Sequence, residues 1–275
     1  MTQISAADVS KIRKTTGAGM MDCKKALQEA NGDFNKAIEI IRKKGQAIAN
    51  KRADREASEG VVLARINHDN TFGAMIALNC ETDFVAKNED FIKFAQQILD
   101  LAIENNPSDL DALSQVKINS KTIADKIVEQ IGVIGEKIEL AYYGKINAAQ
   151  VVPYVHPGNK LATLVGFSMD TEVQVAKDIA MQVAAMNPVA VDKDDIPAEI
   201  IEKEKEIGRE QALREGKPEH IVDKIAEGKL NKYYKESTLL NQQFTKDNKK
   251  TVRQYLQDNN KELTVTKFLR YSLSN

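Results

Sequence analysis

The stretch that decides the fold is residues 60–80, which read GVVLARINHDNTFGAMIALNC. Residues 60–67 form an apolar run typical of a strand, residues 68–70 are turn formers, and residues 72–80 form a second apolar run. This order predicts a β-hairpin. A polar connection follows, and then a helical pattern over residues 88–104 that ends before Asn106-Pro107.

The same order of elements recurs over residues 150–188. Two predicted strands flank the turn His156-Pro157-Gly158-Asn159, and a helical pattern again ends in Asn-Pro, at Asn187-Pro188. Further elements are predicted as helices at residues 120–132 and 250–258 and strands at residues 137–146 and 263–273. The repeat predicts an α+β core of two related subdomains side by side, which we place at residues 56–147 and 148–275.

Residues 1–55 are predicted to form a three-helix docking module with its linker. Ser5 and Asp8 are a capping pair for the first helix, Asn31-Gly32 ends the second, and Asp33 caps the third. Gly45 is expected to close the third helix, so that residues 46–59 form a helical linker to the core.

Residues 197–235 consist almost entirely of helix formers, interrupted by Gly216-Lys217-Pro218. Two helices joined by so short a turn must run antiparallel. Their apolar stripe is narrow and consists of Ile200, Ile207, Ile221 and Ile225. A narrow stripe buries one seam only, and we therefore expect a projecting helical hairpin.

Charge and cysteine content restrict the function. The 275 residues carry a net charge of −1, which argues against a chain that binds nucleic acid over its whole surface. Residues 1–55 nevertheless hold 12 Lys and Arg against 6 Asp and Glu, which indicates a basic module that meets an acidic or anionic partner. The two cysteines form no disulfide framework, and no secretory signal or membrane-spanning run is present, so we expect a cytoplasmic protein.

Two short motifs are candidate contact surfaces. Gly17-Ala18-Gly19 lacks the Lys-Ser/Thr of a phosphate-binding loop and is interpreted as a turn. Met20 and Met21 follow it, and because adjacent helical positions cannot both face a core, at least one is expected to contact a partner. Asp83-Phe84 has two interpretations, with Phe84 either in the core or protruding as an anchor, and its polar neighbours favour the anchor.

No pattern in the sequence indicates catalysis. His68, His156 and His220 have no metal-ligand spacing with each other or with cysteine, and no nucleophile elbow, catalytic triad order or zinc-protease motif is present. With no Trp and 5% aromatic residues, a platform for base stacking is not expected either. We therefore predict a binding protein rather than an enzyme, without cofactor or metal.

Five motifs in this order resemble those of the bacterial translation elongation factor Ts family. They are TGAGMMDCKKAL at residues 16–27, NGD at residues 31–33, TDFVA at residues 82–86, IGE at residues 134–136 and EGKP at residues 215–218. The similarity extends from about Val9 to Tyr271. Many members of that family continue into a further C-terminal helical module, whereas this sequence ends at Asn275.

The resemblance implies a fold and an activity. The fold is an N-terminal ubiquitin-associated-like three-helix domain, a two-subdomain α+β core and a coiled-coil hairpin. The activity is guanine-nucleotide exchange on the GTPase elongation factor Tu, with no membrane or direct nucleic-acid partner. In the family the Asp-Phe pair enters the GTPase beside its magnesium site. The implied contact residues are Asp83, Phe84, Thr82, Val85, Met20, Met21, Ile134, Gly135 and His156.

Two points stay open at this stage. The complex with the GTPase could be a simple dimer or a heterotetramer. A rival from another class is a nucleic-acid or ribosome-binding adaptor that uses the basic residues 1–55, and a steep dependence of affinity on salt would identify it.

Overall fold

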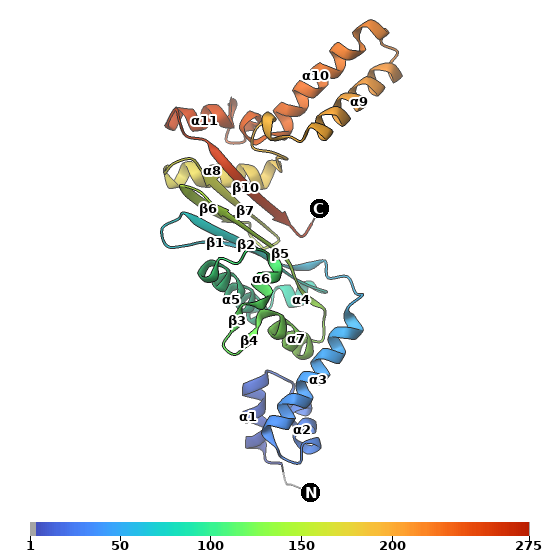
Figure 1. The fold of residues 1–275 in the computed structure, drawn as a ribbon, viewed down its shortest axis with the longest axis vertical. Coiled ribbons are helices and arrows are strands. Elements are labelled where there is room, and N and C mark those ends of the chain that lie inside the picture. Colours follow the sequence, from blue (N-terminus) through green and yellow to red (C-terminus); the bar gives the residue numbers. More distant parts are fainter. Residues whose placement is uncertain (1–3, 275) are drawn as a thin grey trace.

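The computed structural model describes residues 4–274, which form an elongated molecule (Figure 1). Three helices lie at the N-terminal end, two sheets with their helices lie in the middle, and a pair of long helices projects from the far end. Within residues 4–274, every helix is too short or too polar to cross a membrane. The predicted α+β class is confirmed.

The N-terminal module consists of α1 (Ala6–Thr16), α2 (Met20–Glu29) and the first part of α3 (Phe34–Arg52). Ser5 and Asp8 form the predicted capping box, in which each side chain accepts a hydrogen bond of 3.1 Å from the other residue's backbone N–H. Asn31 and Gly32 both have positive φ, which ends α2 as expected. The small core of the module is made by Ile12, Cys23, Leu27 and Ala37.

The prediction that Gly45 closes the third helix is wrong. Helix α3 continues through Gly45 to Arg52, and Gly45 is buried against Gly132 of α7 (Ile123–Ile134). A Cβ atom at Gly132 would lie 2.8 Å from the Cα atom of Gly45, so only glycine permits this approach of the two helices. The first half of the expected linker is therefore the end of one long helix, and its Ile48 and Ala49 pack against the core.

The first subdomain is a three-stranded antiparallel sheet covered by helices. Its strands follow the order β1 (Glu59–Ile66), β2 (Phe72–Cys80), β5 (Ile138–Asn147). Its remaining elements are α4 (Asp83–Ala86), α5 (Glu89–Asn105), α6 (Leu110–Gln115), the short strands β3 (Lys117–Ile118) and β4 (Lys121–Thr122), and α7. Helix α5 packs its apolar face on β1 and β2.

The second subdomain repeats this plan. Its sheet has the order β6 (Gln150–Val155), β7 (Leu161–Phe167), β10 (Val265–Ser272), again antiparallel, with α8 (Val173–Met186) on it. Between α8 and β10 the chain adds the hairpin helices, β8 (Gln243–Phe244), β9 (Asp247–Thr251) and α11 (Val252–Asn259). Helices α5 and α8 end alike, at Asn106 and Asn187, which both have φ 43° and precede proline. The predicted internal repeat thus extends to the strand order.

The two sheets pack face to face. A cluster of buried side chains lies between them: Val62, Met75, Ala77 and Ile146 from the first sheet, and Val151, Ala162 and Leu164 from the second. Helices α5 and α8 lie on the outer faces, so the core has four layers (Figure 1). This packing fixes the turn between β6 and β7 relative to the first subdomain, because the backbone N–H of Val62 donates to the carbonyl of Asn159 at 2.6 Å.

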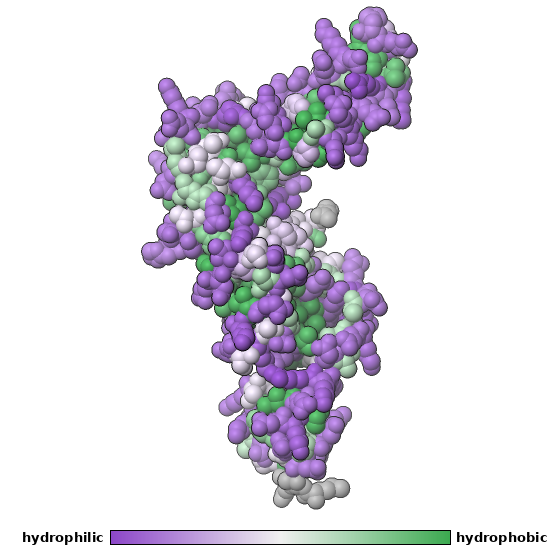
Figure 2. Space-filling view, in the orientation of Figure 1, coloured by the Kyte–Doolittle hydropathy of each residue, from purple (hydrophilic) through white to green (hydrophobic). Residues whose placement is uncertain are grey.

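The projecting hairpin consists of α9 (Ala198–Arg214) and α10 (Glu219–Ser237). Its seam differs from the predicted stripe: Ile200 and Ile207 are each 38% exposed. The buried residues are instead Gly208, Ala212, Val222, Ala226 and Leu230. Small residues allow the two backbones to approach closely, and the isoleucines are left at the margin. Figure 2 shows a largely hydrophilic surface over the hairpin, with apolar side chains gathered near its tip.

Candidate functional site

Phe84 protrudes from the core subdomain. The predicted polar turn at residues 81–87 contains a single turn of helix, α4, which begins at Thr82 with the Thr82 hydroxyl accepting from the Val85 N–H. This helix buries Ala86 and leaves Phe84 83% exposed, the largest exposed fraction among the big apolar residues within 4–274. The interpretation of Phe84 as a core residue is therefore wrong. Val85 packs partly against the core beside it.

Asp83 presents a carboxylate next to this ring. Its side chain is 42% exposed and accepts a 2.7 Å hydrogen bond from the ammonium group of Lys87. That hydrogen bond, and then the charges of Lys87 and Lys160, hold the pKa of Asp83 below its ordinary value. The group is thus an anion at neutral pH, and the side chain that pairs with it is an exposed lysine.

The loop after α7 lies against the start of α4. Both the backbone N–H and the hydroxyl of Thr82 donate to the carboxylate of Glu136, at 3.1 and 2.8 Å. Gly135 ends α7 with φ 81°, and a Cβ atom there would meet nothing within 4 Å, so the backbone is open to a partner. Ile134 is only partly available, because it packs against the core of the first subdomain.

His156 lies on the exposed turn between β6 and β7. Its ring nitrogen Nδ1 is 2.8 Å from the hydroxyl of Tyr154. Lys160 at the end of the turn pairs with Glu59 of β1 at 2.8 Å, and its charge acts on Asp83. The second subdomain therefore contributes a turn to the side of the core that carries α4.

Met20 and Met21 form a separate surface. They begin α2 and are 60% and 61% exposed, so both side chains, and not only one, are free of the core. With Ile4, Ala6 and Val9 they line a largely apolar groove of about 500 Å³. The structure thus divides the predicted contact residues between two places, the α4 side of the core and the start of α2 in the N-terminal module.

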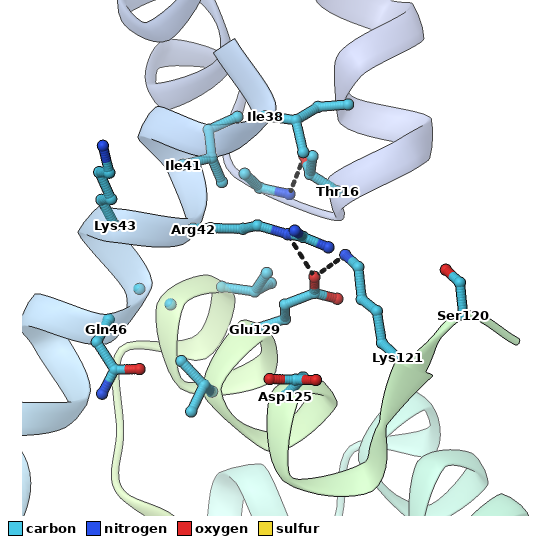
Figure 3. A pocket seen from close by; sticks show the side chains of 15 residues that line it. Thr16, Ile38, Ile41, Arg42, Lys43, Gln46, Ser120, Lys121, Asp125 and Glu129 are labelled. Carbon is cyan, nitrogen blue, oxygen red and sulfur yellow. Dashed lines mark hydrogen bonds and ion pairs between the residues drawn. The ribbon is translucent and has the colours of Figure 1, made fainter. Parts of the chain in front are cut away.

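A polar cavity of about 410 Å³ lies where the module meets the core (Figure 3). Glu129 of α7 pairs there with Arg42 of α3 at 3.6 Å, and also with Lys121 and Lys126. Burial would raise the pKa of Glu129, but the hydrogen bonds from Lys121 and Lys126 hold it below its ordinary value. Because these charged side chains pair with one another, we interpret the cavity as part of the packing contact between α3 and α7 and not as a ligand site.

Sequence reasoning did not identify Arg52, Glu81 and Glu136 as parts of the site. Glu136 binds Thr82 from 54 positions away, and Arg52 binds Glu81 from 29 positions away. No local pattern marks such partners. The available signals were that Glu136 belongs to the recognised IGE motif and that Glu81 directly precedes TDFVA, but neither signal indicates a contact.

The chemistry of the site fits binding. Within residues 4–274, no group of three or more His, Cys, Asp or Glu side chains could hold a metal ion. Cys80 lies directly behind α4, but burial and the carboxylate of Glu136 raise the pKa of its thiol to about 12. A thiol so protonated is a poor nucleophile. The surface offers an aromatic ring, a carboxylate and open backbone.

Comparisons with known proteins agree on one family. The family model described as Elongation factor TS matches residues 81–275. The chain is 53% identical to Elongation factor Ts of Porphyromonas gingivalis over 272 residues, which cover 98% of both chains. It is 49% identical to Elongation factor Ts of Christiangramia forsetii over 275 residues, covering 99% of this chain and 100% of the relative. Elongation factor Ts of Cytophaga hutchinsonii is 46% identical over both full lengths.

Proposed function

The chain belongs to the elongation factor Ts family, and on that basis we propose that it promotes release of GDP from the GTPase elongation factor Tu during translation elongation. This places its work in the cytoplasm, where ribosomes act. It makes and breaks no covalent bond. The observation that carries the proposal is the Phe84 side chain, 83% exposed on a helix that is anchored to the core.

The activity follows from thermodynamic linkage. A factor that binds the nucleotide-free GTPase more tightly than the GDP-bound form weakens GDP binding by the same factor. The binding energy must therefore come from contacts that exist only when GDP has left. Insertion of Phe84 between elements of the GTPase supplies such a contact, because burying the ring contributes about 1.5–3 kcal/mol.

Asp83 places a carboxylate next to the inserted ring. Its carboxylate is ionised at neutral pH and is paired with the exposed Lys87. Beside a magnesium and phosphate site it disturbs the network of charges that holds GDP. Loss of the magnesium ion removes much of the positive charge that offsets the diphosphate. In this proposal Thr82, Val85, Gly135 and His156 also contact the GTPase, with Ile134 as a partly buried support.

The N-terminal module supplies a second contact that holds the GTPase, which we call the grip. Met20 and Met21 line an apolar groove, and methionine adapts its shape to a partner surface. Asp22 of α2 pairs with Lys44 in the middle of α3, whereas Arg52 at the end of α3 pairs with Glu81 beside α4, so the factor holds its partner at two places along α3. This second contact keeps the GTPase bound while insertion of Phe84 strains its nucleotide site. We leave the stoichiometry of the complex to measurement, as one factor per GTPase or two of each.

The rival function, a nucleic-acid or ribosome-binding adaptor, rests on the basic residues 1–55. Several of these cations are already paired: Lys43 with Glu39 at 2.9 Å, Lys44 with Asp22, and Arg52 with Glu81. The charge available to phosphates is therefore smaller than the count of lysines and arginines indicates. A protein partner for the exposed methionines is the better supported proposal.

The test is release of labelled GDP from purified elongation factor Tu, with and without this protein. We expect the release rate to rise with the concentration of the factor and then to saturate. A rate unchanged at every concentration would contradict the proposal. Measuring the binding of the protein to RNA at several salt concentrations tests the rival, which requires a steep loss of affinity as salt rises.

A further inference from the structure

Glu81 lies directly before α4 and binds three segments of the chain together. Its carboxylate accepts hydrogen bonds from the backbone N–H of Lys137 at 2.6 Å, from Arg52 at 2.7 and 2.9 Å, and from Arg55 at 3.2 Å. The Glu81 side chain is only 13% exposed. Charge-assisted hydrogen bonds shielded from water in this way are among the stronger ones in proteins.

Glu136 holds the other side of the same turn. It accepts from the backbone N–H and the hydroxyl of Thr82, and that hydroxyl in turn caps α4. Glu136 follows Gly135 at the end of α7, and Lys137 follows it in contact with Glu81. Two carboxylates thus tie the start of α4 to the loop after α7.

This arrangement, which we name the carboxylate clamp (Glu81 and Glu136), reaches the N-terminal module through α3. Arg52 is the last residue of α3, whose first turns form the module. The same helix packs on α7 at the contact between Gly45 and Gly132, before α7 runs on to Gly135 and Glu136. Helices α3 and α7 therefore meet the Phe84 turn (residues 82–86) at one point, the carboxylate clamp.

The ionic state of Glu81 agrees with a permanent clamp. Burial would raise the pKa of Glu81, but the hydrogen bonds from the Lys137 backbone and from Arg52 outweigh it and hold the pKa below its ordinary value. The group is charged at neutral pH, and its partners offset the cost of shielding part of that charge from water. The Phe84 side chain itself makes no such bonds, so its direction depends on the backbone that the clamp fixes.

We propose that Glu81 and Glu136 are positioning residues, which hold the Phe84 turn at a fixed angle to α3 so that the N-terminal module and Phe84 meet the GTPase as one rigid surface. This inference rests on the proposed function and adds two supporting residues to it. A fixed orientation matters because Phe84, which we call the wedge, must stay inserted in the GTPase to displace the elements that hold GDP. Displacement of a functional group by about 1 Å can cost on the order of 100-fold in rate.

The experiment is a double-mutant cycle with Phe84. The Glu81→Gln and Glu136→Gln variants of the full-length protein are made in the wild-type and in the Phe84→Ala background. GDP release from elongation factor Tu is then measured over a range of factor concentrations. We expect each single variant to lower the maximal release rate on the order of tenfold and to change the half-saturating concentration by less than about twofold. In the Phe84→Ala background the same substitutions are expected to have no further effect, because the residue they position is gone.

The matched control is Asp100→Asn, which breaks an exposed pair with Arg65 on the same subdomain and is expected to keep the wild-type rate. Arg52→Gln is a milder variant for the case that Glu81→Gln does not fold, since Arg55 and the Lys137 N–H still hold Glu81. Thermal melts accompany each variant.

Four results would decide against the inference. They are an unchanged maximal rate, an equal loss in both backgrounds, a change confined to the half-saturating concentration, and an equal loss in the Asp100→Asn control. If the wild-type protein does not accelerate GDP release, both the proposed function and the role of the carboxylate clamp are wrong. An active wild type whose Glu81 and Glu136 variants are equally active overturns the clamp alone.

Discussion

The Phe84 turn and the methionine surface (Met20 and Met21 at the start of α2) both expose apolar side chains, but they are supported in opposite ways. The Phe84 turn rests on a four-layer core and is tied by Glu81 and Glu136. The methionine surface rests on a small three-helix core that joins the rest through α3 and α7. The rigid ring of Phe84 on a well-packed core is suited to insertion between elements of the GTPase. The flexible side chains of Met20 and Met21 on a small module are suited to binding the surface of the GTPase.

The comparison predicts different kinetic effects for the two places. Loss of the grip should raise the concentration of factor needed for half-maximal exchange. Loss of the wedge should lower the maximal rate, because the wedge acts on the bound complex. The following predictions run from the largest expected effect to the smallest.

Removal of the module should have the largest effect. Deleting residues 1–44 removes α1, α2 and half of α3 but keeps Ile48, Ala49 and Arg52 on the core. Because two linked contacts bind far more tightly than one, we expect the half-saturating concentration to rise about 100-fold or more. GDP-release curves measure this, and circular dichroism checks that the core stays folded. Full exchange by the truncated protein at low concentration would rule out the grip.

Phe84→Ala should lower the maximal exchange rate most among single substitutions, by up to about 3 kcal/mol or roughly 100-fold if the ring is fully buried in the complex. Stability should stay within about 1 kcal/mol, since the ring is 83% exposed. GDP release and thermal melts test the two parts. Val173→Ala on α8, which removes a side chain that is 64% exposed, is the matched control. An undiminished rate would remove the wedge from the mechanism.

Replacing Met20 and Met21 together by alanine should affect binding instead. At about 1 kcal/mol for each side chain, the half-saturating concentration should rise roughly tenfold while the maximal rate is kept. Titration of labelled elongation factor Tu measures the affinity directly. A loss of maximal rate with unchanged affinity would mean that the two surfaces do not divide the work as we infer.

Asp83→Ala should reduce the maximal rate by only a few-fold, because the wedge acts without the carboxylate. Lys87→Ala is the matched control, since it breaks the same ion pair and keeps the carboxylate. The hydrogen bond from Lys87 keeps the pKa of Asp83 below its ordinary value, so the group is charged throughout the neutral range in the wild type. If the Lys87 variant loses as much rate as the Asp83 variant, the ion pair matters and the free carboxylate does not.

Shortening the hairpin should have the smallest effect. Gly208 and Ala226 face each other across its seam, so residues 207–226 can be replaced by a short turn. We expect the exchange rate to change by about twofold at most, because few residues carry most of the energy of an interface and none of those proposed lies there. Complete loss of exchange in a folded variant would show that the hairpin is a third contact.

Much of the architecture could be predicted from sequence because the signals are local. The capping box of Ser5 and Asp8, the left-handed Asn31-Gly32 and the paired Asn-Pro ends of α5 and α8 each involve residues within a few positions of one another. Apolar runs likewise placed β2 at its observed bounds, and β6 and β7 on either side of the predicted turn. The exposure of Phe84 followed from its polar neighbours for the same reason.

The errors and omissions concern residues whose partners lie far away in sequence. Gly45 was expected to end a helix, but its place opposite Gly132 makes it a contact point within one. The hairpin seam was assigned to isoleucines, whereas close approach of the backbones selected Gly208 and Ala226. In both cases a small residue permits two helix backbones to approach closely. No local sequence pattern indicates which helices will be in contact.

By itself, the sequence determined most of the long helices and strands, the repeat, the basic module and the exposed Met and Phe residues, because backbone preferences and apolar periodicity act over a few residues. The tertiary structure alone decided that α3 is one continuous rod, that the two sheets pack face to face, and that Glu81 and Glu136 hold the Phe84 turn. The contacts of Glu81 with Arg52 and Lys137 join residues 29 and 56 positions apart, and such contacts form only when the whole chain has packed.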